Sequence, residues 1–319
     1  MSTLVRENIA SMQGYSWGEQ PKTSTNLIKL NTNENPYPPS PNVIRALQTL
    51  DTEGLRTYPN PLADELREEV AKLNRIADEN VVITNGGDEG LRLSLTTFVD
   101  PGETVCFADP SYSLYPVLAA IQGANIKPVA YSDGWEIPET FPEKIKSFNA
   151  KMSYLVNPHA PSGNFYSLGA LDKIAQSAPG VLLIDEAYAD FIDPSLNYQS
   201  TELLKKYDNV LILRTFSKGY SLAGIRLGYL MGNEALISPI ISKTRDSYNV
   251  GSIQQRLGTA AITDQEYSQK IWKKIRENRT HLQDRLTALG LAINPSQSNF
   301  ILVEIDNQTV DAHSLYLSL

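Results

Sequence analysis

Cysteine and histidine are scarce in this sequence, with one cysteine and three histidines in 319 residues. The single thiol, Cys106, cannot form a disulfide within the chain, which excludes a disulfide-stapled fold. Three scattered imidazoles and one thiol cannot build an ordinary His/Cys zinc site. We therefore expect no metal centre.

Long apolar runs and a net positive charge are also missing. No stretch approaches the roughly 18 uninterrupted apolar residues of a membrane span, and Met1 to Gln20 lack the apolar core of a signal peptide. The formal net charge is -8, which argues against nucleic acid or an acidic membrane as the partner, because both attract clustered lysine and arginine. These absences predict a cytoplasmic protein that acts on small molecules.

The middle of the sequence alternates short apolar runs with amphipathic segments, which is typical of an α/β fold. The predicted strands are Val81–Thr84, Thr104–Ala108, Ile126–Tyr131, Met152–Val156, Val181–Ile184, Val210–Arg214 and Arg226–Met231. The predicted helices between them include Gly90–Val99, Tyr112–Gln122, Ser167–Ser177 and Asn233–Ile241. Most of these strands are apolar on both faces, so we expect a mostly parallel central sheet with helices on both sides.

The chain is longer than one hydrophobic core usually requires, which favours one large and one smaller domain. Residues 1–41 are rich in proline up to Pro41 and are predicted to form an irregular arm that also contributes to the small domain. Residues 42–250 form the predicted large domain. Residues 251–319 form the predicted small α+β domain.

In the predicted small domain, the apolar residues of Ser252–Leu289 recur only with helical spacing, which predicts a helical stretch. A strand pair is predicted after it, at Leu291–Asn294 and Phe300–Ile305. The final residues, Val310 to Leu319, begin an apolar-periodic helix that has no C-terminal stop signal. We therefore expect this domain to be incomplete.

The strongest local motif directly follows the apolar strand Val210–Arg214. Lys218 stands there between hydroxyl side chains, and Arg226 follows eight residues later. An ordinary lysine is a solvated surface charge. Open α/β sheets, however, bind ligands at the carboxyl ends of their strands, and hydroxyls with a guanidinium suit a phosphate dianion.

The segment Thr215–Tyr229 resembles the lysine region of the class I and II aminotransferases, which are fold-type-I enzymes that use pyridoxal phosphate. The resemblance implies that Lys218 links covalently to this cofactor and later carries the proton that moves during the reaction. It also implies that Thr215, Ser217 and Arg226 hold the cofactor phosphate. The expected fold is the large domain of a fold-type-I transferase.

A second motif, Asp185 to Tyr188, closes the apolar run Val181–Ile184. Alone, an aspartate in this place is usually a turn former. Pyridoxal phosphate withdraws electrons only while its ring nitrogen is protonated, and a carboxylate beside that nitrogen favours the charged form. The resemblance assigns this role to Asp185 and implies that Tyr188 hydrogen-bonds the cofactor's phenolic oxygen.

A third motif, Asn157 to Gly163, also follows a strand and resembles the family loop in which the first asparagine contacts the phenolic oxygen and the substrate carboxylate. Asn157 takes that role by resemblance. His159 and Ala160 stand where these enzymes often have asparagine. We interpret His159 as a partly exposed loop residue and not as a catalytic base, since Lys218 already supplies the base.

A glycine-rich turn, Thr84 to Gly90, joins a strand to a helix. It is either a plain turn or an anion site at a helix start, where backbone N–H groups lack partners. The resemblance implies that the amides of Gly87, Asp88 and Glu89 contact the cofactor phosphate. Tyr112 matches the aromatic residue that stacks on the cofactor ring, the alternative being a core tyrosine.

Two N-terminal segments, Leu30–Pro38 and Arg56–Pro61, resemble those of histidinol-phosphate aminotransferases. In that family the tyrosine matching Tyr58 reaches the cofactor phosphate of the neighbouring subunit, and the one matching Tyr15 lies near the substrate. Plain turn residues are the alternative for both tyrosines. The resemblance implies a homodimer with active sites shared across the interface.

The reaction implied is amino transfer between L-histidinol phosphate and 2-oxoglutarate in histidine biosynthesis. The alternatives are an aromatic or broad-range aminotransferase, a threonine-phosphate decarboxylase, and a cofactor-binding protein without turnover. The resembling enzymes also carry an arginine near their C-terminus that pairs with the substrate's carboxylate or phosphate. The sequence stops at Leu319 before such a segment, so we expect weak transamination from the chain as it stands.

Overall fold

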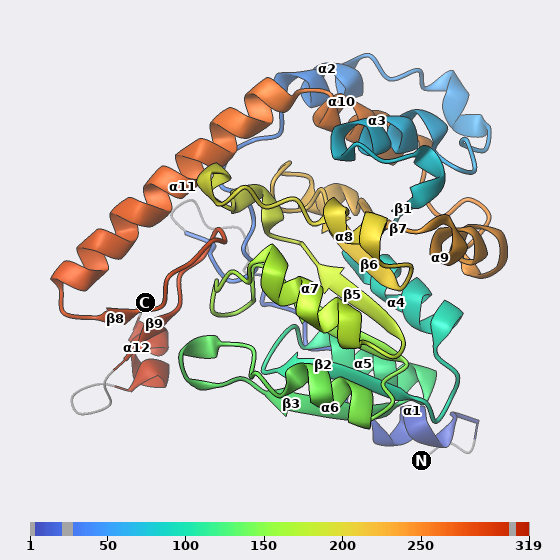
Figure 1. The fold of residues 1–319 in the computed structure, drawn as a ribbon. Helices are drawn as coiled ribbons and strands as arrows, with labels where there is room; N and C mark the ends of the chain where they lie inside the picture. Colours follow the sequence, from blue (N-terminus) through green and yellow to red (C-terminus); the bar gives the residue numbers. More distant parts are fainter. Residues whose placement is uncertain (1–3, 21–27, 306–310, 319) are drawn as a thin grey trace.

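The computed structural model describes residues 4–20, 28–305 and 311–318, and Figure 1 shows their arrangement. Val310 and Leu319, the ends of the predicted last helix, lie outside the described residues. A seven-stranded sheet runs through the molecule in the order β1-β7-β6-β5-β4-β2-β3. Its strands are β1 (Val81–Thr84), β2 (Thr104–Asp109), β3 (Asn125–Ala130), β4 (Met152–Val156), β5 (Val181–Asp185), β6 (Val210–Thr215) and β7 (Gly228–Gly232).

The mostly parallel α/β sheet predicted from the sequence is confirmed, with one exception. Strand β7 pairs antiparallel with both of its neighbours, β1 and β6. No crossover helix stands between β6 and β7, and without one the chain cannot return to start a parallel neighbour. All other pairs in the sheet are parallel.

Helices cover the sheet and the regions beside it. The described helices are α1 (Glu7–Ser11), α2 (Pro41–Gln48), α3 (Asp64–Asn74), α4 (Gly86–Phe98), α5 (Leu114–Gln122), α6 (Phe141–Ser147), α7 (Leu168–Ser177), α8 (Thr201–Lys206), α9 (Glu234–Pro239), α10 (Ser252–Ile262), α11 (Gln265–Ala288) and α12 (Ala312–Ser318). None of the helices in the described ranges is long and apolar enough to cross a membrane.

The strands other than β3 are largely buried on both faces, as their apolar sequences predict. Strand β3 lies at one side of the sheet, with β2 as its one neighbour, and is mostly exposed. Leu182 and Ile184 belong to a core cluster with residues of α3, α6, α7, α8 and α10, whereas Leu183 belongs to a second cluster with residues of α4, α5 and α9. Because successive side chains of a strand point to opposite faces, these two clusters lie on the two sides of the sheet.

Several predicted boundaries were wrong. Pro41 was expected to prevent regular structure, but it begins α2, where its fixed φ suits the first helical position and Ser40 accepts from the Val43 N–H. The arm also contains the short helix α1. Helices α3, α6 and α8 were not predicted, since each is short or highly charged and gives a weak apolar period.

The C-terminal part also differs from the prediction in detail. The predicted helical stretch is split at Thr263 and Asp264 into α10 and α11, and Asp264 caps α11 by accepting from the Tyr267 N–H. The predicted strand pair is reduced to the two-residue strands β8 (Ala292–Ile293) and β9 (Val303–Glu304), which form a separate antiparallel sheet. In Figure 1, α11 runs along one side of the molecule toward these strands.

Candidate active site

Four segments with predicted site residues meet at one edge of the sheet. Strand β5 ends at Asp185, β6 ends at Thr215, and β4 is followed directly by Asn157. Strand β7 runs in the opposite direction, so its first residues, just after Arg226, lie at this same edge. Carboxyl ends of parallel strands are where open α/β sheets bind ligands.

The amine of Lys218 lies within this edge. Its Nζ donates to the carbonyl oxygen of Thr32 at 2.6 Å and lies 5.7 Å from the centre of the Tyr188 ring. Burial lowers the pKa of Lys218 to about 8, and the positive charge of Arg226 acts in the same direction, while Glu34 and Asp88 oppose it. A substantial fraction of the amine is therefore neutral near neutral pH and able to act as a nucleophile.

Asp185 is buried, with 4% of its surface exposed. One carboxylate oxygen accepts from the Tyr115 hydroxyl at 2.7 Å and the other from the Ala187 N–H at 3.1 Å. Desolvation raises the pKa of Asp185 to about 6, although both hydrogen bonds lower it. A buried carboxylate of this kind gains most from a cationic partner.

A group suited to phosphate lies beside Lys218. Ser217 Oγ accepts from the Arg226 guanidinium at 3.3 Å and from the Thr215 hydroxyl at 3.0 Å. The same guanidinium donates to Asp88 at 3.2 Å, so Arg226 also meets the first turn of α4. Gly86 has φ +80°, and an added Cβ would stand 2.7 Å from Arg226 Nη2, so any other residue here would strain the backbone and displace the guanidinium.

Helix α4 begins at Gly86, four residues earlier than predicted. The N–H groups of Gly87, Asp88 and Glu89 therefore belong to its first turn, where the backbone donors have no intrahelical partner. The Glu89 carboxylate lies at the N-terminal end of this helix, where it accepts from the N–H of the N-cap residue Asn85 at 2.6 Å and from Asn249 at 2.7 Å. Because its contact is with the Asn85 N–H, the N–H groups of Gly87 and Asp88 are left for an anion.

Tyr188 and the N-terminal arm meet over Lys218. The Tyr188 hydroxyl accepts from Asn33 at 3.2 Å, and burial raises the pKa of Tyr188 to about 12. Phe300 packs edge-on against the Tyr188 ring. Tyr188 is thus a neutral hydroxyl at physiological pH, held by residues far away in the sequence.

Tyr112 and Tyr15 lie next to each other, as predicted for residues of one site. Their ring centres are 6.1 Å apart, and the Tyr112 hydroxyl donates to Asp88 at 3.1 Å. Tyr112 also packs edge-on against Tyr115, the tyrosine that donates to Asp185. Tyr112 and Tyr115 therefore connect Asp88, in the first turn of α4, with the buried carboxylate of Asp185.

Asn157 is fully buried, but its amide faces its own loop. Its Nδ2 donates to the Tyr166 carbonyl at 3.0 Å and its Oδ1 accepts from the Tyr166 N–H at 2.8 Å. The backbone N–H of Asn157 donates to the Asp185 carbonyl at 2.8 Å. In this conformation Asn157 fixes the loop beside Asp185, and its amide bonds are already formed within the chain.

The prediction that His159 is partly exposed was wrong, because the residue has 0% exposure. Its ring packs between Tyr131, Trp135 and Tyr166. Burial lowers the pKa of His159 to about 4. The sequence could not show this, since two of the three aromatic residues around the ring, Tyr131 and Trp135, come from a separate segment of the chain.

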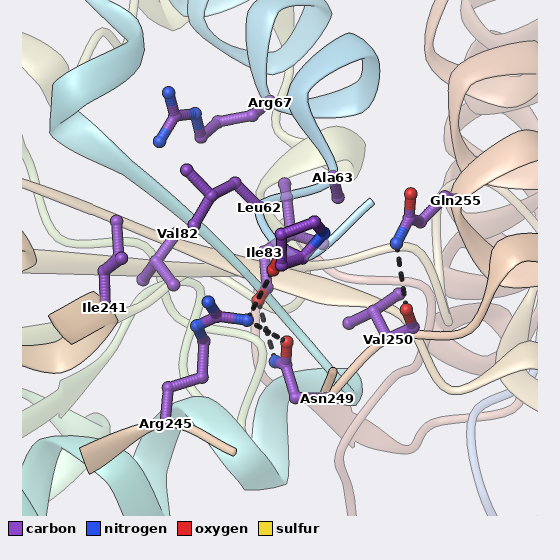
Figure 2. Close-up of a pocket in the computed structure, with 11 residues that line it drawn as sticks. Leu62, Ala63, Arg67, Val82, Ile83, Ile241, Arg245, Asn249, Val250 and Gln255 are labelled. Atoms are coloured by element: carbon purple, nitrogen blue, oxygen red, sulfur yellow. Dashed lines mark hydrogen bonds between the residues drawn. The ribbon is translucent and has the colours of Figure 1, made fainter. Parts of the chain in front are cut away.

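Tyr58 is not brought to the group around Lys218 by any described contact of this chain. Its side chain is 80% exposed and stacks on Tyr248, with ring centres 4.5 Å apart. Figure 2 shows a small pocket in which Arg245 donates to the Pro61 carbonyl and to Asn249. None of the residues predicted to contact the cofactor lines that pocket.

Sequence reasoning missed three residues that complete the group, namely Tyr115, Asn33 and Thr32. Tyr115 had a usable signal, because it stands three residues after Tyr112 at the start of a helix, where such residues share a face. For Asn33 and Thr32, the one signal in the sequence was their position in the N-terminal segment Leu30–Pro38.

The assembled group fits pyridoxal phosphate. The neutral fraction of Lys218 suits attachment to an aldehyde, the buried carboxylate of Asp185 suits a protonated ring nitrogen, and Arg226 with the first turn of α4 suits a phosphate. At Gly86 an added Cβ would meet Arg226, so the guanidinium packs directly against the start of α4.

Comparisons with known proteins agree with this chemistry. The model of the aminotransferase class I and II family matches residues 25–319. The histidinol-phosphate aminotransferase of Geotalea daltonii is 42% identical over 297 residues, covering 93% of this chain and 83% of that protein. That of Rippkaea orientalis is 40% identical over 317 residues, covering 99% of this chain and 87% of that protein.

A solved structure gives the same result. The histidinol-phosphate aminotransferase of Sinorhizobium meliloti, in complex with pyridoxal-5'-phosphate, superposes with a TM-score of 0.80 at 28% identity. The match covers 85% of this chain and 74% of that one. By its fold, its sequence relatives and the group around Lys218, this chain belongs to the pyridoxal-phosphate-dependent class I and II aminotransferases.

Proposed function

We propose that this chain transfers the amino group of L-histidinol phosphate to 2-oxoglutarate in histidine biosynthesis. The observation that carries amino transfer is the partly buried Lys218 amine, with its lowered pKa, at the same end of the sheet as the buried Asp185 carboxylate. The substrate is supported by relatives of about 40% identity over most of the chain, which bear the name histidinol-phosphate aminotransferase.

When bound, pyridoxal phosphate supplies an aldehyde for reversible attachment of amines and a ring that withdraws electrons from the substrate's Cα. In our proposal the Lys218 amine would hold the cofactor and, once released from it, would serve as the base at the substrate's Cα. Its lowered pKa suits this work, because a base is most effective when its pKa lies near the working pH.

The neighbours of Lys218 hold and orient the cofactor. Asp185 keeps the ring nitrogen protonated, and the Tyr115 hydroxyl fixes the carboxylate that does so. Tyr188 donates its proton toward the phenolic oxygen, because at neutral pH its hydroxyl is uncharged. Thr215, Ser217, Arg226 and the amides of Gly87, Asp88 and Glu89 bind the phosphate.

Tyr112 stacks on the cofactor ring, while Tyr15 and Asn157 lie on the substrate side. For Asn157 this role requires its amide to exchange a bond to Tyr166 for one to the ligand. Asn157 is thus the least direct of the proposed contacts.

We further propose a homodimer in which Tyr58 reaches the cofactor phosphate of the partner subunit. In this chain Tyr58 is 80% exposed, and Leu47 and Leu55 nearby in the sequence are exposed too. Exposed apolar residues of this kind are typical of an interaction surface. We also propose an N-terminal arm (1–41), a large domain (42–250) and a small domain (251–319), acting in the cytoplasm.

The test is a panel of amino donors offered to the cofactor-loaded protein, read as conversion of the bound cofactor to its aminated form. We expect L-histidinol phosphate to convert it faster than aromatic amino acids or aspartate. Faster conversion by an aromatic donor would favour the broad-range alternative, and release of CO2 from threonine phosphate would favour the decarboxylase. No conversion by any donor would favour a binding protein without turnover.

A further inference from the structure

The ring of His159 connects two loops that carry proposed site residues. Its Nε2 lies 3.1 Å from the carbonyl oxygen of Pro110, in the loop after β2, and its Nδ1 lies 2.8 Å from the hydroxyl of Ser162, in the loop after β4. Tyr112 stands two residues after Pro110, and Asn157 two residues before His159. Both ring nitrogens are therefore used, one toward each loop.

The partners decide the tautomer. A carbonyl oxygen can only accept, so Nε2 must carry the proton that it donates to Pro110. Nδ1 then accepts from the Ser162 hydroxyl, whose oxygen in turn accepts from the Asn164 N–H at 3.1 Å. Every donor in this chain of bonds has an acceptor when the ring is neutral.

The surroundings keep the ring in place. Tyr131 lies 4.3 Å from the His159 ring, centre to centre, and Trp135 lies 5.8 Å away on a bend of the chain. That bend is itself held by Asn164, which donates to the Gly134 carbonyl at 2.8 Å. A ring with no exposed surface and two fixed hydrogen bonds cannot rotate without breaking both.

We propose that His159 is a positioning residue that fastens the Pro110–Tyr112 loop to the loop after β4 and thereby sets Tyr112 over the cofactor ring. The effect on the cofactor rests on the proposed function, whereas the tautomer and the link to Pro110 do not. His159 touches neither cofactor nor substrate in this account, and it donates no proton in the reaction.

The link is tested without cofactor by nitrogen-15 NMR of the chain labelled at histidine. With three histidines in the sequence, the His159 signals are assigned by comparison with His159→Gln. We expect a neutral ring protonated at Nε2. A ring protonated at Nδ1, or one that averages between tautomers, would overturn the proposal.

The positioning role is tested with three variants. His159→Gln can still donate to Pro110, His159→Asn is too short to do so, and His159→Phe keeps the ring without any hydrogen bond. We expect the affinity for pyridoxal phosphate and its induced circular dichroism to fall about tenfold in the Asn and Phe variants, and less than about threefold in the Gln variant.

His281→Phe, an exposed position on α11, is the matched control and should leave both readings unchanged. If His159→Phe does not fold, the comparison of Gln with Asn still decides the matter. Equal affinity and equal dichroism in these two variants would overturn the role of the Pro110 bond. Failure of the wild-type chain to use histidinol phosphate would overturn the proposed function instead and would leave these results intact.

Discussion

At the scale of single residues, the structure assigns unusual protonation behaviour to the two groups that the sequence singled out first. Lys218 loses part of its charge and Asp185 resists gaining its charge, and in both cases burial is the largest cause. Perturbed groups of opposite type in one place are a common property of active sites.

The lowered pKa of Lys218 predicts how fast the cofactor attaches. Only the neutral amine attacks an aldehyde, so the attachment rate of pyridoxal phosphate to the cofactor-free protein should rise about tenfold per pH unit below the pKa and level off above about 8. Stopped-flow absorbance measures this rate. A midpoint near the ordinary lysine value of 10.5 would show that Lys218 is not desolvated.

Lys218→Ala is the control for this measurement. It should give no covalent adduct after borohydride reduction and no turnover, while its circular dichroism in the far ultraviolet stays that of the wild type. Lys205→Ala, which removes an exposed lysine on α8, should change neither property.

The raised pKa of Asp185 predicts that this residue destabilises the cofactor-free fold. A carboxyl group whose pKa is higher in the folded than in the unfolded protein is disfavoured as an anion in the folded state. The loss of folding free energy that this causes is absent below about pH 4 and complete above about pH 6. Asp185→Asn removes this charge; its amide oxygen can still accept from the Ala187 N–H, and the Tyr115 hydroxyl can turn to accept from its amide nitrogen. We expect the variant to be more stable at pH 7.5 by about 1–3 kcal/mol, with the difference vanishing toward pH 4.

Urea unfolding of both cofactor-free proteins at several pH values measures this difference. The same variant should lose about 1000-fold in turnover, because an unprotonated ring nitrogen makes a poor electron sink. A variant that is less stable than the wild type at pH 7.5 would contradict the stability prediction, and near-normal turnover would contradict the role of Asp185.

Among single residues, those with reactive or charged side chains in the site were predicted from the sequence. The residues that hydrogen-bond and orient these side chains were missed. Lys218, Asp185 and Arg226 stand in long motifs and lie together at one edge of the sheet. Tyr115, Asn33 and the Thr32 carbonyl act through contacts between segments distant in the sequence, which no local pattern reveals. The burial of His159 escaped prediction for the same reason.

At the scale of elements, the corner between β1, α4 and β7 depends on glycine. Gly86 has φ +80° and Gly102 has φ +86°, but only at Gly86 would a Cβ meet Arg226. Alanine at either position should cost about 1 kcal/mol of stability from backbone strain.

Gly86→Ala and Gly102→Ala therefore form a matched pair. The Arg226 side chain can move away from a new Cβ, so the fold should survive Gly86→Ala, but the guanidinium would leave its place beside Ser217. We expect the affinity for pyridoxal phosphate to fall about 10- to 100-fold in Gly86→Ala only. Titration of the cofactor-free proteins measures it, and equal affinity in the two variants would show that Arg226 does not bind the phosphate.

The elements that the sequence predicted well are those with strong local patterns. Apolar strands such as β5 were placed to within one residue, whereas α3, with few apolar residues, was missed. The start of α4 was set four residues late because Gly86 and Gly87 are poor helix formers. They are tolerated because the first turn packs against β6 and β7, where Gly90 stands close to Leu213 and Leu230.

At the scale of the whole molecule, the α/β architecture followed from the alternation of strands and helices, since this pattern leaves few arrangements of a parallel sheet. The reversed direction of β7 did not follow, because it depends on the absence of a helix between β6 and β7. That reversal is what brings Arg226 to the edge that carries Lys218 and Asp185.

The exposed stack of Tyr58 on Tyr248 leads to a prediction about assembly. If Tyr58 acts on the partner's cofactor, a hybrid of Lys218→Ala and Tyr58→Phe chains carries one intact site and one doubly damaged site. When the two variants are mixed, dissociated and allowed to reassociate, each hybrid dimer should regain up to about half of the wild-type activity. Activity assays on purified hybrids measure this.

The control hybrid joins Lys218→Ala with Asp185→Ala, two residues that this chain places in one site. Each of its sites lacks one of the two residues, so no activity should return even though hybrids form. Recovery in the Tyr58 hybrid but not in the control would establish the shared site. No recovery in either hybrid would mean that Tyr58 acts within its own subunit, whereas a Tyr58→Phe homodimer that is already active before mixing would mean that Tyr58 contributes little; in both cases the exposed aromatic stack would need a different partner.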